Sequence, residues 1–186
     1  MPAPTEGPRT YAQWSECLDR LALGTQDEAC LSDMGRGELS WSGGVGPLFA
    51  QRLADEFNAR LTRCSEHLTR DLRMGADEGS VVRAILNARQ SLLFLHRLAQ
   101  LPVFADTLRA HLTSEVRSFA ERSQKSLEDS AQADHSGRLR LLLQNNNLLR
   151  YEALAAHVAA TSPSTPASTA TTGTPPSGPR RRNILI

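Results

Sequence analysis

Five histidines and three cysteines are the side chains of this sequence best suited to hold a metal or attack a substrate. No histidine lies four residues from another and no H-E-x-x-H motif is present, so the spacing of a helical zinc site is missing. Di-iron bundles need Glu-x-x-His pairs, and Glu152 with His157 lacks that spacing. We therefore expect no metal and no cofactor, and we interpret His96 as a core histidine.

The cysteines, Cys17, Cys30 and Cys64, have no C-x-x-C spacing. Catalysis by Cys64 would need a neighbouring base, but this residue lies in an apolar stripe, where a free thiol behaves as a small hydrophobe. No G-x-S-x-G motif is present, and the Asp-Glu pairs at 27–28, 55–56 and 77–78 are typical of solvated faces or helix starts. The sequence favours a protein that is not an enzyme.

A glycine-rich stretch, "SDMGRGELSWSGGVGP", raises the possibility of a phosphate-binding loop. A P-loop needs a lysine after its last glycine, and the one lysine of the chain is Lys125. We interpret residues 24–46 as a long irregular loop, held to the domain by Trp41.

The elements that must position these side chains are helices, because the apolar residues recur every three or four positions. A short helix is expected from Thr10, its N-cap, to about Leu23, with Gly24 at its end. A long helix starts at Pro47 and ends near Met74. Its stripe is Phe49, Leu53, Phe57, Leu61, Cys64, Leu68 and Leu72, and the other faces carry Asp55, Glu56, Arg60, Arg63, Glu66 and Arg70.

Three further helices are predicted. Residues 77–101 are apolar over more than half of the helix circumference, which indicates the most buried helix. Residues 103–129 repeat the spacing of the preceding stripe, with Phe104, Leu108, Leu112, Val116, Phe119, Ser123 and Leu127. Residues 137–160 form the last helix, in which "QNNN" marks a bend or an inward asparagine that fixes register.

Short connections make consecutive helices antiparallel neighbours. The predicted fold is an all-α, antiparallel up-down bundle of about four main helices plus a short N-terminal helix, with a disordered C-terminal tail. Residues 1–9 are expected to be flexible, 10–160 to form the bundle, 161–179 to be a disordered Ser/Thr/Pro-rich linker, and 180–186 to be a basic and apolar peptide.

Charge is divided unevenly along the chain. All 20 acidic residues precede Thr161, together with 18 of the 21 basic ones, so the body carries about −2 and the tail +3. A nearly neutral body argues against nucleic-acid binding by the whole domain. No signal peptide and no apolar run long enough to span a membrane is found, so we expect an intracellular, cytoplasmic protein.

The tail ends in RRRNILI, which is the strongest functional lead. It comprises Arg180, Arg181, Arg182, Asn183, Ile184, Leu185 and Ile186. Ile184 and Ile186 lie on one side of an extended strand, so the peptide can add a strand to a partner's sheet, and its apolar-x-apolar end resembles the C-terminal ligands of PDZ domains. Weak contact with anionic membrane and folding back onto the bundle are the alternatives.

The function predicted from the sequence is a non-enzymatic scaffold or adaptor in a multiprotein assembly, which binds protein partners through this peptide and the bundle surface. The alternative is a helical regulator that binds a small ligand or nucleic acid inside the bundle, with a cavity lined by His96 and Tyr151. A bundle enzyme with a cofactor that the sequence hides is a third class. Formation of a homodimer stays open.

Overall fold

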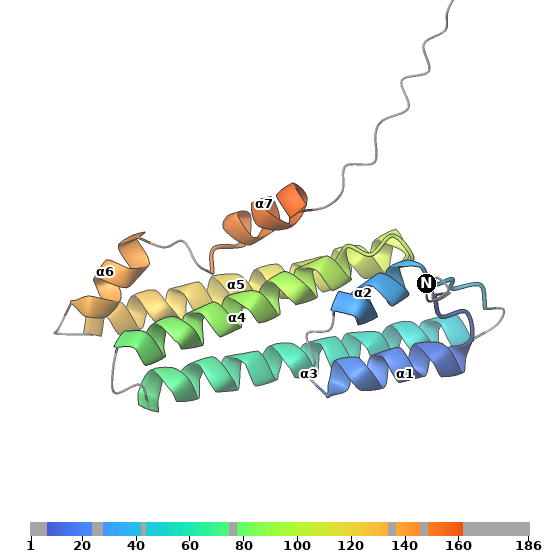
Figure 1. Cartoon of the computed structure of the whole chain (residues 1–186), viewed down its shortest axis with the longest axis horizontal. Helices are drawn as coiled ribbons and strands as arrows, with labels where there is room; N and C mark the ends of the chain where they lie inside the picture. Colours follow the sequence, from blue (N-terminus) through green and yellow to red (C-terminus); the bar gives the residue numbers. More distant parts are fainter. Residues whose placement is uncertain are drawn as a thin grey trace, which may run out of the picture.

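The computed structural model describes residues 7–23, 28–41, 44–74, 78–133, 137–145 and 149–161. These residues form an all-α fold without strands, as predicted (Figure 1). The helices are α1 (Tyr11–Ala22), α2 (Glu28–Gly35), α3 (Val45–Met74), α4 (Glu78–Ala99), α5 (Asp106–Ala133), α6 (Arg138–Asn145) and α7 (Tyr151–Thr161). Within this described part of the chain, no helix is both long and apolar enough to cross a membrane.

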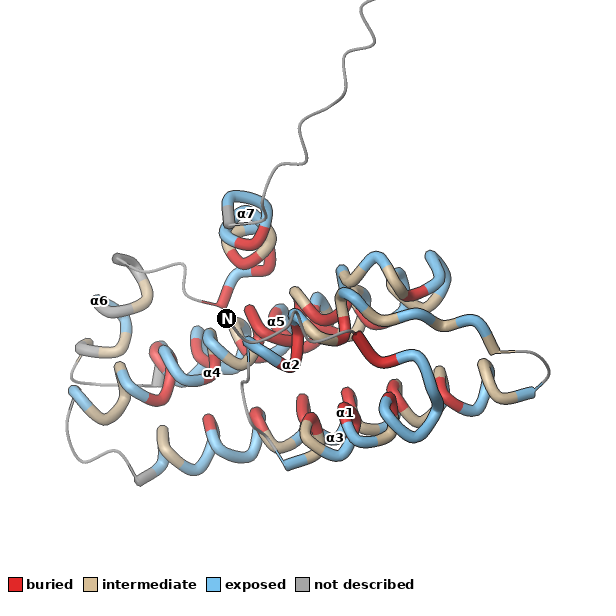
Figure 2. The backbone as a smooth tube through the Cα atoms, turned by 45° about the vertical axis from the view of Figure 1, so that its right-hand side comes forward, coloured by how far each residue is buried: buried red, intermediate tan, exposed pale blue. Residues whose placement is uncertain are grey.

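Helices α3, α4 and α5 form the centre of the bundle, and each runs antiparallel to the next (Figure 1). Helix α4 packs against α3, α5 and α7, and its residues Leu92, Leu95 and Leu98 are completely buried. The prediction that this segment is the most enclosed helix is confirmed. Figure 2 shows that the buried positions follow the sides on which the helices face one another.

The predicted apolar stripes form the core. On α3, six of the seven stripe residues, from Phe49 to Leu68, are buried, while Leu72 is half-buried. On α5 the stripe from Leu112 to Leu127 is buried, and Leu108 is half-buried. The bounds differ from the prediction, because α3 begins two residues before Pro47 and residues 101–105 form a turn, so that α5 spans Asp106–Ala133.

Helix α1 begins at the predicted cap. The hydroxyl of Thr10 accepts a hydrogen bond from the backbone N–H of Gln13 at 3.3 Å, and the Gln13 side chain accepts one from the Thr10 N–H at 3.0 Å. This capping box satisfies two amide groups that the first turn leaves without helical partners.

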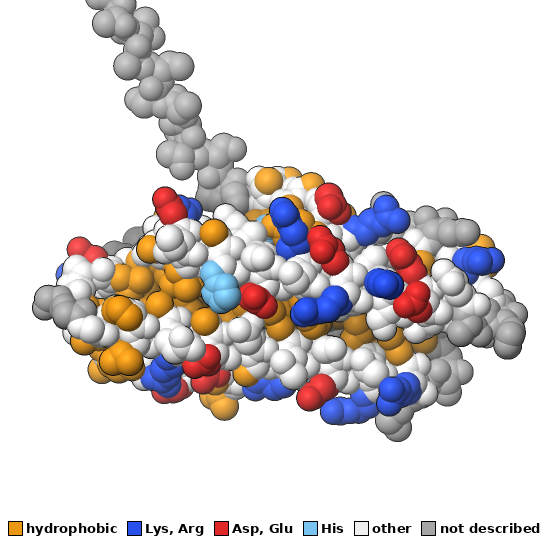
Figure 3. Space-filling view, turned by 180° about the vertical axis from the view of Figure 1, so that it is seen from behind, with side chains coloured by type: hydrophobic (Ala, Val, Ile, Leu, Met, Phe, Trp, Pro, Cys, Tyr) orange, Lys and Arg blue, Asp and Glu red, His pale blue; other side chains and the backbone are white. Residues whose placement is uncertain are grey.

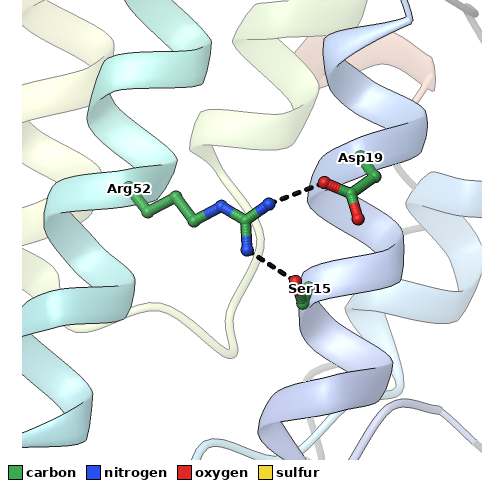
Figure 4. A network of polar contacts seen from close by, with 3 residues as sticks. All are labelled: Ser15, Asp19 and Arg52. Carbon is green, nitrogen blue, oxygen red and sulfur yellow. Dashed lines mark hydrogen bonds and ion pairs between the residues drawn. The ribbon is translucent and has the colours of Figure 1, made fainter.

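Helix α1 lies along α3 and runs in the same direction, because the chain returns through α2 before α3 begins (Figure 1). Arg52 on α3 joins the two helices (Figure 4). Its guanidinium donates to the hydroxyl of Ser15 at 2.5 Å and to the carboxylate of Asp19 at 2.6 Å. The forked group of arginine suits two acceptors one helical turn apart.

The expectation that residues 24–46 form one irregular loop is wrong, because the eight-residue helix α2 lies within them. Its residues Cys30, Leu31 and Met34 are buried, and their spacing places them on one face of a helix. The run is too short for a periodic pattern to stand out beside the glycines that follow. Residues 24–27 and 42–43 lie outside the described part.

Of residues 1–9, which the sequence predicts to be flexible, the structure describes Gly7, Pro8 and Arg9 and places them against the segment after α2. Gly7 and Pro8 are buried, and the carbonyl of Pro8 accepts a hydrogen bond from the N–H of Glu38 at 2.9 Å. A Cβ atom on Gly7 would lie 2.3 Å from the carbonyl carbon of Arg36. Only glycine permits this approach of two backbones.

The expected single helix over residues 137–160 is interrupted. Helix α6 ends at Asn145, and α7 begins at Tyr151 after the described chain resumes at Leu149. Asparagine weakens a helix interior because its side chain competes for backbone hydrogen bonds. The two halves pack on different surfaces, with α6 on α5 and α7 on both α4 and α5.

Candidate functional site

The predicted partner-binding residues, Arg180 to Ile186, lie outside the described residues, as does the linker from Ser162. What the structure places is the helix that precedes them. Leu149, Leu154 and Val158 are buried where α7 packs on α4 and α5. Helix α7, which ends at Thr161, therefore packs on the bundle directly before the predicted linker.

The described helices also enclose a groove that the sequence does not predict. It lies between α3 and α4, beside the C-terminal end of α1, and has a volume of about 410 Å³. Its lining mixes apolar, basic and amide side chains: Leu23, Arg60, Arg63, Cys64, His67, Leu68, Asp71, Ala84, Asn87, Ala88 and Ser91.

Two arginines of α3 connect this groove to α1. Arg60 donates to the carbonyl oxygen of Leu21 at 3.1 Å, and Arg63 donates to that of Ala22 at 2.6 Å. The last carbonyls of a helix lack helical partners and carry partial negative charge, so these guanidinium groups stabilise the end of α1. The guanidinium of Arg60 also lies 4.7 Å from the centre of the Phe94 ring.

Burial of Arg60 corrects an expectation, because the sequence placed it with Arg63 on the solvent faces of α3. Arg60 is 5% exposed. Burial, and then the charge of Arg63, lowers the pKa of Arg60. The signal in the sequence is its position three residues after Phe57 and four before Cys64, beside the apolar stripe. The apolar pattern of α3 does not show that a charged side chain such as Arg60 is buried by donating a hydrogen bond to another helix.

The thiol of Cys64 lies in the same groove wall. Its Sγ is 4.0 Å from the carbonyl oxygen of Ala88 on α4. Burial raises the pKa of Cys64 to about 11, against the opposing effects of Arg60 and of a hydrogen bond with Ser91. The thiol is therefore protonated at neutral pH, and its 8% exposure fits the interpretation as a small hydrophobe.

His96 is a core residue, as predicted, with 4% of its surface exposed. Its ring meets that of Tyr151 edge to face at 5.4 Å, and the guanidinium of Arg117 lies 4.6 Å from the centre of the Tyr151 ring. Burial lowers the pKa of His96, and its Nδ1 has no hydrogen-bond partner among the described atoms. His96 and Tyr151 contact each other and do not line the groove.

Within the described ranges, no group of three or more His, Cys, Asp and Glu side chains is placed to hold a metal ion. The groove offers hydrogen-bonding groups, two guanidinium groups and one carboxylate, that of Asp71. Two guanidinium groups beside an imidazole suit a small anionic ligand such as a carboxylate or a phosphate.

Comparison of the chain with protein-family models, with curated proteins and with solved structures finds no match.

Proposed function

We propose that this chain is a non-enzymatic adaptor whose helical bundle carries a partner-binding peptide, Arg180–Ile186. The observation that carries the proposal is the change of composition after α7. Residues 161–179 contain no charged and no large apolar residue, and the seven that follow contain three arginines and three large aliphatic residues. This composition favours the interpretation of residues 161–179 as a linker.

The linker sets the reach of the peptide. A chain of 19 residues behaves as a coil with a mean span of roughly 25 Å. A peptide on such a tether has a raised effective concentration near anything that the bundle binds. The anchored position of α7 supports this arrangement, because the tether starts from a packed helix.

Binding by strand addition is the mechanism that the residues favour. Ile184 and Ile186 would enter pockets on one side of the added strand, and Leu185 would point to the other side. The three arginines would meet acidic residues of the partner, which raises the association rate more than the final affinity.

The bundle surface is the second part of the proposed interface. Seen from behind, hydrophobic side chains form a band along the molecule between charged groups (Figure 3). Single large apolar residues are also exposed, among them Leu48 on α3 at 68% and Leu141 on α6 at 60%. Scattered exposed leucines are ordinary on a soluble protein, so the peptide is the primary element of the proposal.

The test compares the proteins retained from the source lysate by the full-length chain and by a chain that ends at Gly178, with identification by mass spectrometry. We expect a partner to disappear with the last eight residues. An I184D/I186D variant should lose it too, while the L185D control should retain more of it because Leu185 points away. An identical set of partners for the full-length and shortened chains would contradict the proposal.

A second candidate function is a regulator that binds a small anion in the groove between α3 and α4. The buried Arg60 beside Arg63 and His67 favours it. We expect inorganic phosphate or a small dicarboxylate to raise the melting temperature of the full-length chain and to have less effect on the H67A variant. No stabilisation by any of these anions at millimolar concentration would contradict it.

A further inference from the structure

The sulfur-bearing side chains of Cys17, Cys30 and Met34 are buried where α1 packs on α2, and none of them lines the groove. The Sγ of Cys30 lies 3.9 Å from the Sδ of Met34 and 4.0 Å from the carbonyl oxygen of Cys17. The Cys17 and Cys30 side chains share a hydrogen bond. All three residues are buried, with exposed fractions of 7% for Cys17, 4% for Cys30 and 1% for Met34.

The 3.9 Å between the Cys30 and Met34 sulfurs matches the spacing of two ligands in a three-coordinate metal site. A metal–sulfur bond is about 2.3 Å long, so three sulfurs around a trigonal ion lie about 4 Å apart. Cys30 and Met34 are four residues apart on α2 and therefore lie on the same face. Cys17 supplies the third sulfur from α1, so the two helices would hold the ion between them.

We propose that Cys17, Cys30 and Met34 form a binding site for a soft monovalent metal ion, Cu(I). Thiolate and thioether sulfur select Cu(I) over hard cations. Structural zinc needs four ligands from cysteine, histidine or carboxylate, and the described residues contain no group of even three such side chains. The Met34 thioether is the ligand that favours Cu(I) over zinc at this cluster.

Binding is a proton exchange without a redox step. The S–H bonds of Cys17 and Cys30 break, their two protons pass to the buffer, and Cu(I) forms two bonds to thiolates and one to the Met34 thioether. The product carries a charge of −1. Arg20 near Cys17 and Arg60 near Cys30 favour the buried anion, while the nearby Asp33 opposes it.

Proton release makes the affinity rise with pH. The hydrogen bond with Cys30, followed by burial, raises the pKa of Cys17. Because thiol ligands bind a metal ion as thiolates, binding releases their protons.

The test is an anaerobic titration of the reduced full-length chain with Cu(I), against a chelator whose colour reports free Cu(I). We expect the wild type to withdraw one equivalent. C17S and C30S should each lower the affinity by at least about 100-fold, because losing a thiolate ligand costs more than the roughly 10- to 100-fold of an outer-shell change, and M34L by about 10-fold. C64S is the matched control and should bind as the wild type does, because Cys64 lies against Ala88 on α4.

Three results would overturn the proposal. The first is that the wild type withdraws no Cu(I), and the second is that C64S weakens binding as much as C17S does. The third is an X-ray absorption spectrum of the loaded wild type with nitrogen or oxygen rather than sulfur around the copper. This spectrum needs no variant, and M34L conserves side-chain volume, so the proposal stays testable if a serine variant fails to fold.

Discussion

Arg60 has a structural role in the core, although arginine is mostly found exposed on protein surfaces. It is buried, its guanidinium donates to the Leu21 carbonyl, and it lies against the Phe94 ring. A buried charge costs free energy unless its hydrogen bonds are made, and the end of α1 supplies an acceptor. Arg63 acts in the same way on Ala22 from a half-buried position. The same two side chains line the groove, so a ligand bound there would contact the residues that hold the end of α1.

The first prediction concerns this contact. Arg60→Ala should lower the free energy of unfolding by about 2 kcal/mol, because it removes a charged hydrogen bond and leaves a buried carbonyl without its donor. Arg70→Ala on the exposed face of α3 is the matched control and should change stability by less than about 0.5 kcal/mol. Urea denaturation measures both. Equal losses in the two variants would show that Arg60 does not support α1.

His96 gives a prediction on pH dependence. Burial lowers its pKa from the ordinary value of 6.5, so as pH falls below 6.5 the unfolded chain takes up this proton before the folded chain does. Stability from the neutral ring is complete above pH 6.5 and is lost as pH falls toward the lower folded pKa.

Thermal unfolding of the wild type and of His96→Leu between pH 7.5 and 5 tests this sign. The wild type should lose more stability on acidification than the variant does. Parallel curves would mean that His96 is protonated equally in the folded and unfolded chains.

At the scale of elements, the N-terminal residues, α1 and the segment after α2 form one packed unit. The indole N–H of Trp14 donates to the carbonyl of Glu38 at 3.1 Å, and that of Trp41 donates to the carbonyl of Arg9 at 3.2 Å. Trp14 also packs edge to face on Phe49 at 5.2 Å. These contacts join residues far apart in sequence to the start of α3.

Gly37 gives the prediction for this unit. A Cβ atom there would lie 2.4 Å from the ring of Trp14, so Gly37→Ala should destabilise the fold by about 1–3 kcal/mol. Gly46→Ala on α3 is the control, because its Cβ meets no atom within 4 Å. The control should be neutral or stabilising by up to about 1 kcal/mol, since alanine favours a helix over glycine. Melting temperatures that fall equally would contradict the close contact.

The long helices were predictable because each repeats its apolar residues over many turns, as Phe49 to Leu68 do on α3. Helix α2 was not, since Cys30, Leu31 and Met34 make too short a pattern, and their burial depends on α1. The interruption after Asn145 follows from the asparagines, but the change of packing surface between α6 and α7 does not. The sequence did not predict the groove. Arg60 and Arg63 donate to carbonyl groups at the end of α1, and these lie nearby only because α1 packs parallel to α3.

The whole molecule combines a helical bundle with a C-terminal peptide, residues 180–186, which contains three arginines, three large aliphatic residues and no acidic residue. Residues 1–160 contain all 20 acidic residues and 18 of the 21 basic ones. The arginines of 180–182 are therefore separated from the other charges of the chain by an uncharged linker. We propose that this separation allows Arg180–Ile186 to bind a protein partner.

The most direct measurement of this claim is competition. The full-length chain is immobilised with the partner bound, and a synthetic peptide with the sequence of residues 178–186, GPRRRNILI, is added at increasing concentration. The account predicts that this peptide releases the partner, while a scrambled peptide of the same composition does not. Release by both peptides, or by neither, would contradict the claim that Arg180–Ile186 is the element that binds.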